Sequence, residues 1–263
     1  MLLLIVAGTV FWRFNSSPTH SENYQQLIGQ SKTATLIEQK NTTNQPLSIN
    51  LPDGSSVLLS PQSQIVYPDD MAKSPERQVY LIGEAFFEVQ RNPNKPFMVL
   101  ANDIVTRVLG TSFWVRSYED TPDVSVSVKT GKVSVYPRQL GNNETANWEA
   151  KSGVLLVHNQ EVKYLRSDRR LVKTLVENPL IVNPEIVKTQ AVFDDAPIAK
   201  VFQSLEKAYG IQIVYDEQTF KNCYITAKIY DEPLTETLLL LCKIINATSE
   251  IVDGQIVITG KGC

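Results

Sequence analysis

The residues that most often carry catalysis or bind metals are scarce in this sequence. Its 263 residues include only two histidines, His20 and His158, and three cysteines. The sequence contains no His-x-x-His, Cys-x-x-Cys or Gly-x-Ser-x-Gly pattern, and these patterns mark metal hydrolases, zinc sites and serine hydrolases. We therefore expect no catalytic residue, no cofactor-binding residue and no metal ligand. We expect both histidines to be exposed to solvent.

Two short motifs resemble parts of active sites, but each has a structural interpretation. The segment 110–112, Gly-Thr-Ser, lacks the lysine and the following helix of a phosphate-binding loop, so it predicts a bulge or a tight strand connection. The pair Asp194-Asp195 could act as two catalytic or metal-binding carboxylates. A similar pair, Asp231-Glu232, precedes a second predicted helix, and this repetition favours helix capping in both places.

The three cysteines, Cys223, Cys242 and Cys263, leave several arrangements open. Cys242 falls on the apolar face of a predicted helix, where a thiol behaves as a small buried hydrophobic group. An oxidising compartment would permit a disulfide between Cys223 and Cys242, or a bridge to Cys263. One thiol has to remain unpaired, and spacing alone does not decide which one.

The composition is that of a folded protein without a nucleic-acid partner. The hydrophobic fraction is 43% and the charged fraction is 20%, so disorder of the whole chain is not expected. The net charge is -3, with 25 Lys and Arg against 28 Asp and Glu. This balance provides no basic excess to neutralise phosphates. The length allows one large domain or two modest ones.

The N-terminal residues 1–14 predict part of a transmembrane helix. Residues 1–12 are apolar except for Thr9, and Arg13 and a polar stretch follow at once. Twelve residues span roughly 18 Å as a helix, less than the roughly 30 Å of a bilayer core. A signal peptide or a core helix would be alternatives, but a helix whose first residues are missing fits best. The polar residues 15–32 predict a juxtamembrane linker.

Residues 33–165 predict an all-β domain that is solenoid-like or sandwich-like. Hydrophobic residues alternate with polar ones almost throughout, as at Ala85, Phe87 and Val89. Turn pairs such as Asp53-Gly54 and Thr130-Gly131 recur at short intervals between the alternating runs. In the run that contains Phe113 and Trp114, one of the two aromatic side chains should face outward.

The pattern changes class towards the C-terminus. Residues 166–190 contain three arginines and two Asn-Pro pairs, and predict a connection between domains. Residues 191–263 predict a small domain of the order β-α-β-β-α-β-β, with Ile198, Val201 and Leu205 on one apolar helix face and Gly210 ending that helix. The whole chain is therefore expected to be an α+β multidomain protein.

Four segments of the predicted β domain, in order, resemble the extracytoplasmic part of the FecR family. They are the Leu-Pro-Asp-Gly turn at 51–54, Gly-Glu-Ala-Phe-Phe-Glu-Val at 83–89, Leu-Gly-Thr-Ser-Phe at 109–113 and Gly-Lys-Val-Ser-Val at 131–135. The residues from Val192 onward resemble the small secretin/TonB short N-terminal domain that follows in Bacteroidetes-type members.

The resemblance implies an anti-sigma factor, a sigma regulator of the inner membrane with its body in the periplasm. It implies a single transmembrane helix and a cytoplasmic segment, missing here, that binds an extracytoplasmic-function (ECF) sigma factor. It also implies that the signalling domain of a TonB-dependent outer-membrane receptor contacts the periplasmic body. An alternative is a periplasmic glycan- or ligand-binding module without sigma regulation, for which exposed aromatic residues such as Trp114 and Trp148 would be candidates.

Overall fold

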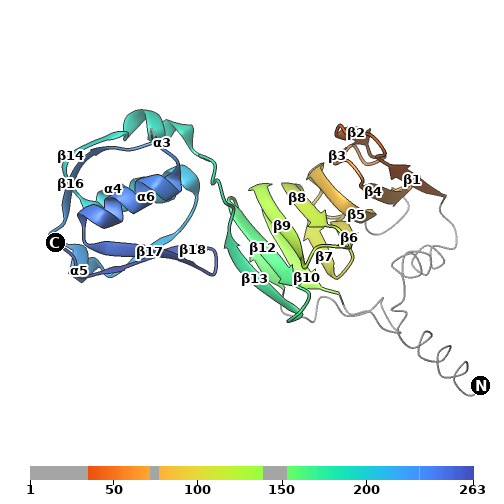
Figure 1. The fold of residues 1–263 in the computed structure, drawn as a ribbon. Helices are drawn as coiled ribbons and strands as arrows, with labels where there is room; N and C mark the ends of the chain where they lie inside the picture. The colour runs from red at the N-terminus through yellow and green to blue at the C-terminus, as the bar shows by residue number, and fades with distance from the viewer. Residues whose placement is uncertain (1–34, 72–76, 139–152, 231) are drawn as a thin grey trace, which may run out of the picture.

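A computed structural model describes residues 35–71, 77–138, 153–230 and 232–263. The predicted membrane segment 1–14 and linker 15–32 lie outside these residues, as do His20, Trp148 and Asp231. Figure 1 shows a larger domain made of strands, which is joined to a smaller domain of helices and strands. The expected order, an all-β domain followed by a small α/β domain, is therefore confirmed.

The larger domain consists of thirteen strands joined into one hydrogen-bonded sheet. The strands are β1 (Leu36–Lys40), β2 (Leu47–Asn50), β3 (Ser56–Leu59), β4 (Gln64–Pro68), β5 (Arg77–Glu88), β6 (Phe97–Ala101), β7 (Ile104–Val108), β8 (Ser112–Ser117), β9 (Asp123–Thr130), β10 (Val133–Pro137), β11 (Val154–Leu156), β12 (Gln160–Leu165) and β13 (Arg170–Leu175). The sheet folds around one core in a nearly closed, barrel-like arrangement (Figure 1).

The twelve-residue strand β5 holds the two halves of this sheet together. Its first half pairs with β4 and β6, and its second half pairs with β3 and β8. The change of partners occurs near Gly83, whose φ of 93° is open to glycine but strained for other residues. A Cβ at Gly83 would overlap Oγ of Ser63, the residue before β4, so there is no room for a side chain at this position.

The alternating sequence pattern explains which side chains enter the core. Residues of β5 alternate between buried and partly exposed along nearly its whole length. Phe87, Phe97 and Phe113 are fully buried, and the rings of Phe87 and Phe113 stack with centroids 5.3 Å apart. Phe113 therefore faces inward and its neighbour Trp114 faces outward, so the expectation that one of the two is exposed is confirmed.

The turn at 51–54 is tied to the start of β5 by a buried ion pair. Nη1 of Arg77 lies 2.9 Å from Oδ2 of Asp53, and the two side chains are 3% and 8% exposed. The same aspartate accepts hydrogen bonds from the backbone N–H and the hydroxyl of Ser55. Arg77 also donates to the carbonyl oxygens of Gln90 and Lys95. This motif therefore has a structural role in the larger domain.

The smaller domain places helices against two small sheets. Its helices are α3 (Pro184–Thr189), α4 (Ile198–Tyr209), α5 (Glu217–Phe220) and α6 (Leu234–Ile244), and its strands are β14 (Val192–Pro197), β15 (Ile213–Tyr215), β16 (Tyr224–Lys228), β17 (Ala247–Val252) and β18 (Gln255–Gly260). One sheet pairs β14 with β16, and the other has the order β15-β18-β17. Both α4 and α6 bury one face in a common core with these strands.

The expected capping of the two main helices by carboxylates is wrong where the structure describes it. Asp194 and Asp195 lie in β14, and α4 begins after Pro197, whose side chain makes no capping hydrogen bond. The hydroxyl of Thr226 in β16 donates towards Asp194 and accepts from the N–H of Asp195. Asp194 and Asp195, which were expected to cap α4, therefore bond to Thr226 of β16 instead.

A proline occupies the N-cap position, just before the first helical residue, of both α4 and α6. Pro197 precedes α4 with φ -54° and ψ 136°, and Pro233 precedes α6 with φ -53° and ψ 150°. The two helix starts therefore resemble each other in the backbone conformation of the preceding proline, and not in capping by a carboxylate. At the other end of α4, Gly210 adopts the left-handed conformation that was expected of it.

Part of the expected connection at 166–190 is regular structure. Strand β13 pairs with β12 along its full length and extends the larger sheet. Helix α3 follows, with Pro184 in its first turn. The sequence pattern did not predict β13, because basic residues interrupt it and only Leu171, Val172 and Leu175 are apolar within the strand.

Candidate protein-interaction surface

Helix α6 exposes large aliphatic side chains to solvent in addition to burying one face. Leu238, Leu241 and Cys242 enter the core of the smaller domain. Three aliphatic residues on its outer side are exposed: Leu239 at 68%, and Leu240 and Ile244, one turn apart, at 56% each, with the exposed Glu236 and Lys243 beside them. A solvent-facing helix surface normally carries polar side chains, so large aliphatic residues this exposed indicate a contact surface.

Strand β17 provides an open sheet edge in the same domain. Among the described residues it pairs only with β18, and every residue after Ala247 is exposed, including Ile251 and Val252. The turn Asp253-Gly254 connects the two strands with positive φ at both positions, as in a two-residue hairpin. Such an edge can accept a further strand through main-chain hydrogen bonds.

The outer face of the larger sheet carries a partly exposed aromatic pair. Trp114 is 37% exposed, and its ring centroid lies 4.9 Å from that of Phe86 on the neighbouring strand. The ammonium of Lys129 lies 5.2 Å from the centre of the Phe86 ring. These contacts cover part of both rings, and cross-strand packing alone accounts for the pair.

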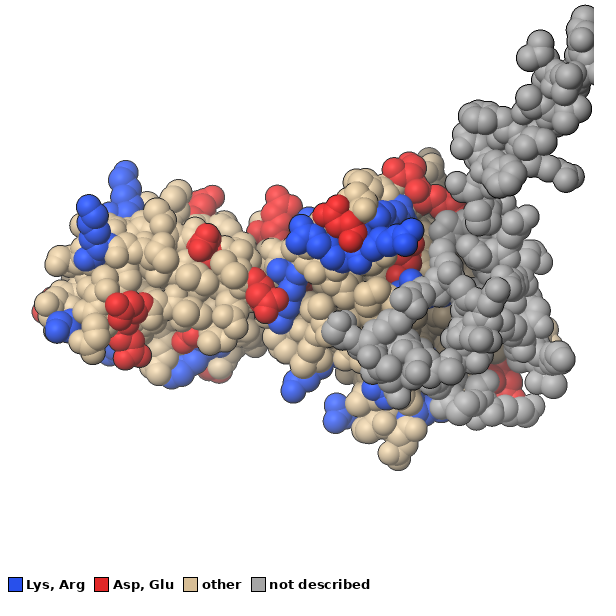
Figure 2. Space-filling view, turned by 90° about the horizontal axis from the view of Figure 1, so that it is seen from below, with Lys and Arg blue, Asp and Glu red and all other residues tan. Residues whose placement is uncertain are grey.

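The charges on the visible surface are of mixed sign. Figure 2 shows a group of Lys and Arg side chains on the larger domain with Asp and Glu side chains beside them. Two ion pairs of this domain, Arg166–Asp103 and Arg170–Asp168, have nitrogen–oxygen distances of 2.9 and 3.3 Å. The face in Figure 2 therefore does not offer the uniform positive field that nucleic acids attract.

The remaining histidine of the described chain lies in a turn, as expected, but it is only partly exposed. Nδ1 of His158 lies 2.9 Å from the carbonyl oxygen of Lys129, so its ring has a structural contact. No group of three or more His, Cys, Asp or Glu residues that could hold a metal ion occurs among the described residues. The segment at 110–112 precedes a β-bulge between β8 and β9, as predicted.

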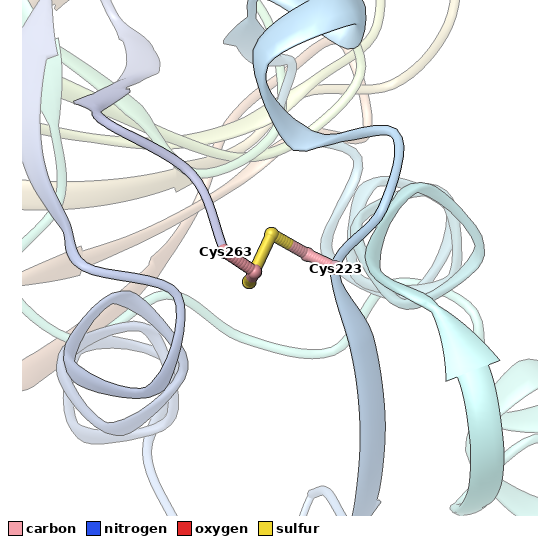
Figure 3. The surroundings of a disulfide bond; sticks show 2 residues. All are labelled: Cys223 and Cys263. Carbon is pink, nitrogen blue, oxygen red and sulfur yellow. A yellow bond between two sulfur atoms is a disulfide. The ribbon is translucent and has the colours of Figure 1, made fainter.

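The cysteines adopt one of the arrangements that the sequence left open. Cys223 and Cys263 form a disulfide with a Cα–Cα distance of 5.3 Å, which ties the residue before β16 to the segment after β18 (Figure 3). Cys242 is the unpaired, buried cysteine that its helix position predicted. Burial raises the pKa of the Cys242 thiol above its usual value, although a hydrogen bond with Ser249 opposes the shift, so the thiol is kept protonated and unreactive.

Comparison with known proteins decides the family. Residues 39–134 match the family model described as FecR protein, and residues 190–258 match the model described as FecR, C-terminal. Together these ranges span more than half of the chain. The chain belongs to the FecR family. The β domain is thus a FecR-type sensory domain of an anti-sigma factor, and the small α/β domain is a FecR C-terminal domain.

Two solved structures resemble this FecR protein. Both are crystal structures of a candidate anti-sigma factor from Parabacteroides distasonis ATCC 8503, at 2.50 and 1.65 Å resolution. Each is 26% identical to this chain, and the matches cover 86% and 85% of it and 99% of the other chain, with TM-scores of 0.48 and 0.47. A comparison with curated proteins found no match.

Membership confirms the expectation of a regulator that is not an enzyme, because FecR proteins are anti-sigma factors that regulate ECF sigma factors. The four motifs at 51–135 fall within or at the edge of the matched range. Among the described residues, no helix has both the length and the apolar character needed to cross a membrane.

Proposed function

We propose that this FecR protein is the periplasmic sensory part of an inner-membrane, single-pass regulator of an ECF sigma factor. It receives its signal from the signalling domain of a TonB-dependent outer-membrane transducer. The proposal rests first on membership of the family. A location in the periplasm agrees with the Cys223–Cys263 disulfide, because such bonds persist in oxidising compartments and are rare in the cytoplasm.

The observation that carries the docking proposal is the group of exposed aliphatic side chains on the outer side of α6. Its three aliphatic side chains, Leu239, Leu240 and Ile244, are each more than half exposed. Their exposure to water is unfavourable by about 25 cal/mol for each Å² of apolar surface, which a partner would recover on covering them. We propose that the transducer's signalling domain covers this face.

Strand β17 supplies the second half of the contact. Lys261 donates its N–H to the carbonyl of Asn246, which sets the hydrogen-bonded positions of the β17–β18 ladder. Because these positions alternate along antiparallel strands, the N–H of Ser249 points to the open edge. A strand of the transducer's signalling domain could pair there, and its side chains would then lie beside the smaller domain.

Binding of the neighbouring transducer's N-terminal signalling domain to this chain tests the proposal. Isothermal titration should show a complex with the unaltered protein. Replacing both Leu240 and Ile244 by Glu should weaken binding more than tenfold, because charged side chains would be desolvated at the centre of the contact. Ser249→Pro should also weaken binding, since proline has no N–H to donate.

Leu155→Glu is the matched control. Leu155 is 51% exposed, but it lies on β11 of the larger domain. This variant should bind as the unaltered protein does. Circular dichroism of every variant confirms folding. Absence of a complex at high micromolar concentration would reject docking, and equal weakening by Leu155→Glu would place the contact elsewhere.

A second candidate function, a glycan- or ligand-binding module, is favoured only by the outward orientation of Trp114. Sugars bind aromatic faces, and part of this ring is accessible. Titration of tryptophan fluorescence with oligosaccharides tests the idea in wild-type protein and in Trp114→Phe. A saturable change that disappears in the variant would support glycan binding, and no change would reject it.

A further inference from the structure

The junction between the two domains is a network of hydrogen bonds centred on Asn159. This residue lies in the turn between β11 and β12, with φ 61°, and it is 4% exposed. Its Nδ2 donates to the carbonyl oxygens of Leu180 and Tyr209, at 2.8 and 2.7 Å. Its Oδ1 accepts from the N–H of Leu180 at 2.8 Å. One side chain of the larger domain thus holds both the connecting segment and the end of α4.

The backbone of Asn159 is bound in the same way to its own domain. Its N–H donates to Val128 of β9, and its carbonyl accepts from Val176, just after β13. All the hydrogen-bonding groups of this buried residue therefore have backbone partners, and these partners lie in β9, in the segment after β13 and in α4. A buried polar group that loses its partner is destabilising, so this position strongly favours the observed arrangement.

The next residue makes a second connection between the domains. Nε2 of Gln160 donates to the carbonyl oxygen of Gly254, in the β17–β18 turn, at 3.0 Å. Its Oε1 accepts from the N–H of Val157 at 3.0 Å, which orients the amide. A Cβ at Gly254 would lie 2.9 Å from Cε of Lys173 on β13, so the turn packs closely against the larger domain.

The connecting segment is also fixed to the smaller domain. The N–H groups of Val182 and Asn183 both donate to the carbonyl of Ala208 in α4. The side chain of Leu175, the last residue of β13, is 6% exposed and belongs to the core of the smaller domain. The sequence predicts a simple connection at 166–190, whereas the residues after β13 are bound at several points.

We infer that these contacts couple the two domains into one body, with Asn159 as the residue that positions them. Rotation of the smaller domain would break the bonds from Asn159 to Leu180 and Tyr209 and the bond from Gln160 to Gly254 together. The inference concerns the junction alone and does not depend on the proposed function. Under that function, a force on the smaller domain would reach β9 and β12 directly.

Amide hydrogen exchange of the full chain tests the coupling. In Asn159→Ala, exchange in peptides that cover residues 176–183 should accelerate about tenfold or more, because the N–H of Leu180 loses its acceptor. Asn159→Asp retains an acceptor for Leu180 but cannot donate to Tyr209, so its acceleration should be smaller. In calorimetry, the single unfolding transition expected for the unaltered protein should split into two in Asn159→Ala.

Asn102→Ala is the matched control. Asn102 is also a buried asparagine with positive φ, 48°, but its side chain donates to Ser117 inside the larger domain. This variant carries the same backbone strain and should leave exchange at 176–183 unchanged. If Asn159→Ala does not fold, Gln160→Ala tests the coupling instead, and amide exchange at residues 253–255 should then be faster than in the unaltered protein. Unchanged exchange at the junction in a folded variant, or two transitions in the unaltered protein, would overturn the inference.

Discussion

Asp53 belongs to a family motif, and its contacts in the structure are structural ones. Its carboxylate holds Ser55 within the turn and Arg77 at the start of β5, and both ionic side chains are nearly inaccessible to water. The guanidinium of Arg77 also lies over the ring of Phe97, with its central carbon 5.5 Å from the ring centroid. Removal of one partner would leave the other as an uncompensated buried charge.

We predict that Asp53→Asn lowers the free energy of unfolding by about 3 kcal/mol, because a buried charge without its partner typically costs 3–5 kcal/mol. Urea denaturation measures the change. Glu84→Gln is the control, since it removes the exposed pair with Arg116, whose side chain is 59% exposed. That variant should change stability by less than about 1 kcal/mol. Equal effects of the two variants would contradict the role of burial.

Glu161 gives the larger domain a predictable dependence on pH. Burial raises the pKa of this carboxyl group above its ordinary 4.5, although Lys163 and a hydrogen bond with Ser125 oppose the shift. The folded chain therefore binds more protons than the unfolded chain just above pH 4.5, and stability falls as pH rises through that region.

Glu161→Gln should flatten this part of the stability profile and raise stability at neutral pH relative to the unaltered protein. The reason is that the amide carries no charge to desolvate. Urea unfolding at a series of pH values from acid to neutral measures both effects. A variant with the same slope as the unaltered protein would show that another group titrates in this range.

At the scale of elements, β5 depends on one glycine. Gly83 combines a φ of 93° with a close approach to Ser63, whereas Gly54 has a similar φ of 84° and no atom within 4 Å of an added Cβ. Substitution of Gly54 therefore tests the cost of backbone strain alone, whereas substitution of Gly83 adds the cost of steric overlap. Ser63 is also held in place, because its hydroxyl accepts the N–H of Glu84.

We predict that Gly54→Ala lowers the free energy of unfolding by about 1–2 kcal/mol, the cost of a left-handed conformation for a residue with a Cβ. Gly83→Ala should cost at least about 1 kcal/mol more, because overlap with Ser63 forces β4 and β5 apart. Chemical denaturation compares the two variants directly. Equal losses would mean that the strands adjust without cost.

The elements that could be predicted from the sequence are those with a clear hydrophobic period. The alternation along 83–89 and the apolar positions of α4 predict elements that the structure contains. Asp194 and Asp195 were misleading because pairing of β14 with β16 outweighs the local preference of carboxylates for a helix start. The pairing of distant strands with β5 has no local signal, nor has the bonding of Asn159 to α4.

The candidate surface was predictable only in part. The sequence predicts strands in the smaller domain, but it does not indicate which of them lies at an open sheet edge, as β17 does. The outer face of α6 was not expected, because the run Leu238-Leu239-Leu240-Leu241 does not show which leucines are buried. Packing of the helix against its sheets decides that question, and packing depends on residues far away in the sequence.

At the scale of the whole molecule, the disulfide should matter mainly for the smaller domain. It closes a loop with a sequence separation of 40 residues, which contains α6, β17 and β18. We predict that Cys263→Ser lowers the stability of this domain by about 2–4 kcal/mol, the usual effect of a bridge of this kind. Calorimetry of the variant measures the loss.

Thiol counting is the direct check on the bridge. Denatured, non-reduced protein should contain one free thiol, from Cys242, and native protein should react slowly because this thiol is buried. Three free thiols in the denatured, non-reduced protein would contradict the bridge. Cys242→Ala should leave no free thiol and should leave the bridge intact.

The position of β5 also bears on the order in which the larger domain is assembled. Strands made before β5 and strands made after it both need it as a neighbour, with partners that extend from Ser56 to Ser117. Until β5 and β8 are both available for pairing, the early hairpins keep unpaired edges. We therefore expect this domain to fold slowly, because its contacts are distant in sequence, and to need protection by chaperones before it closes.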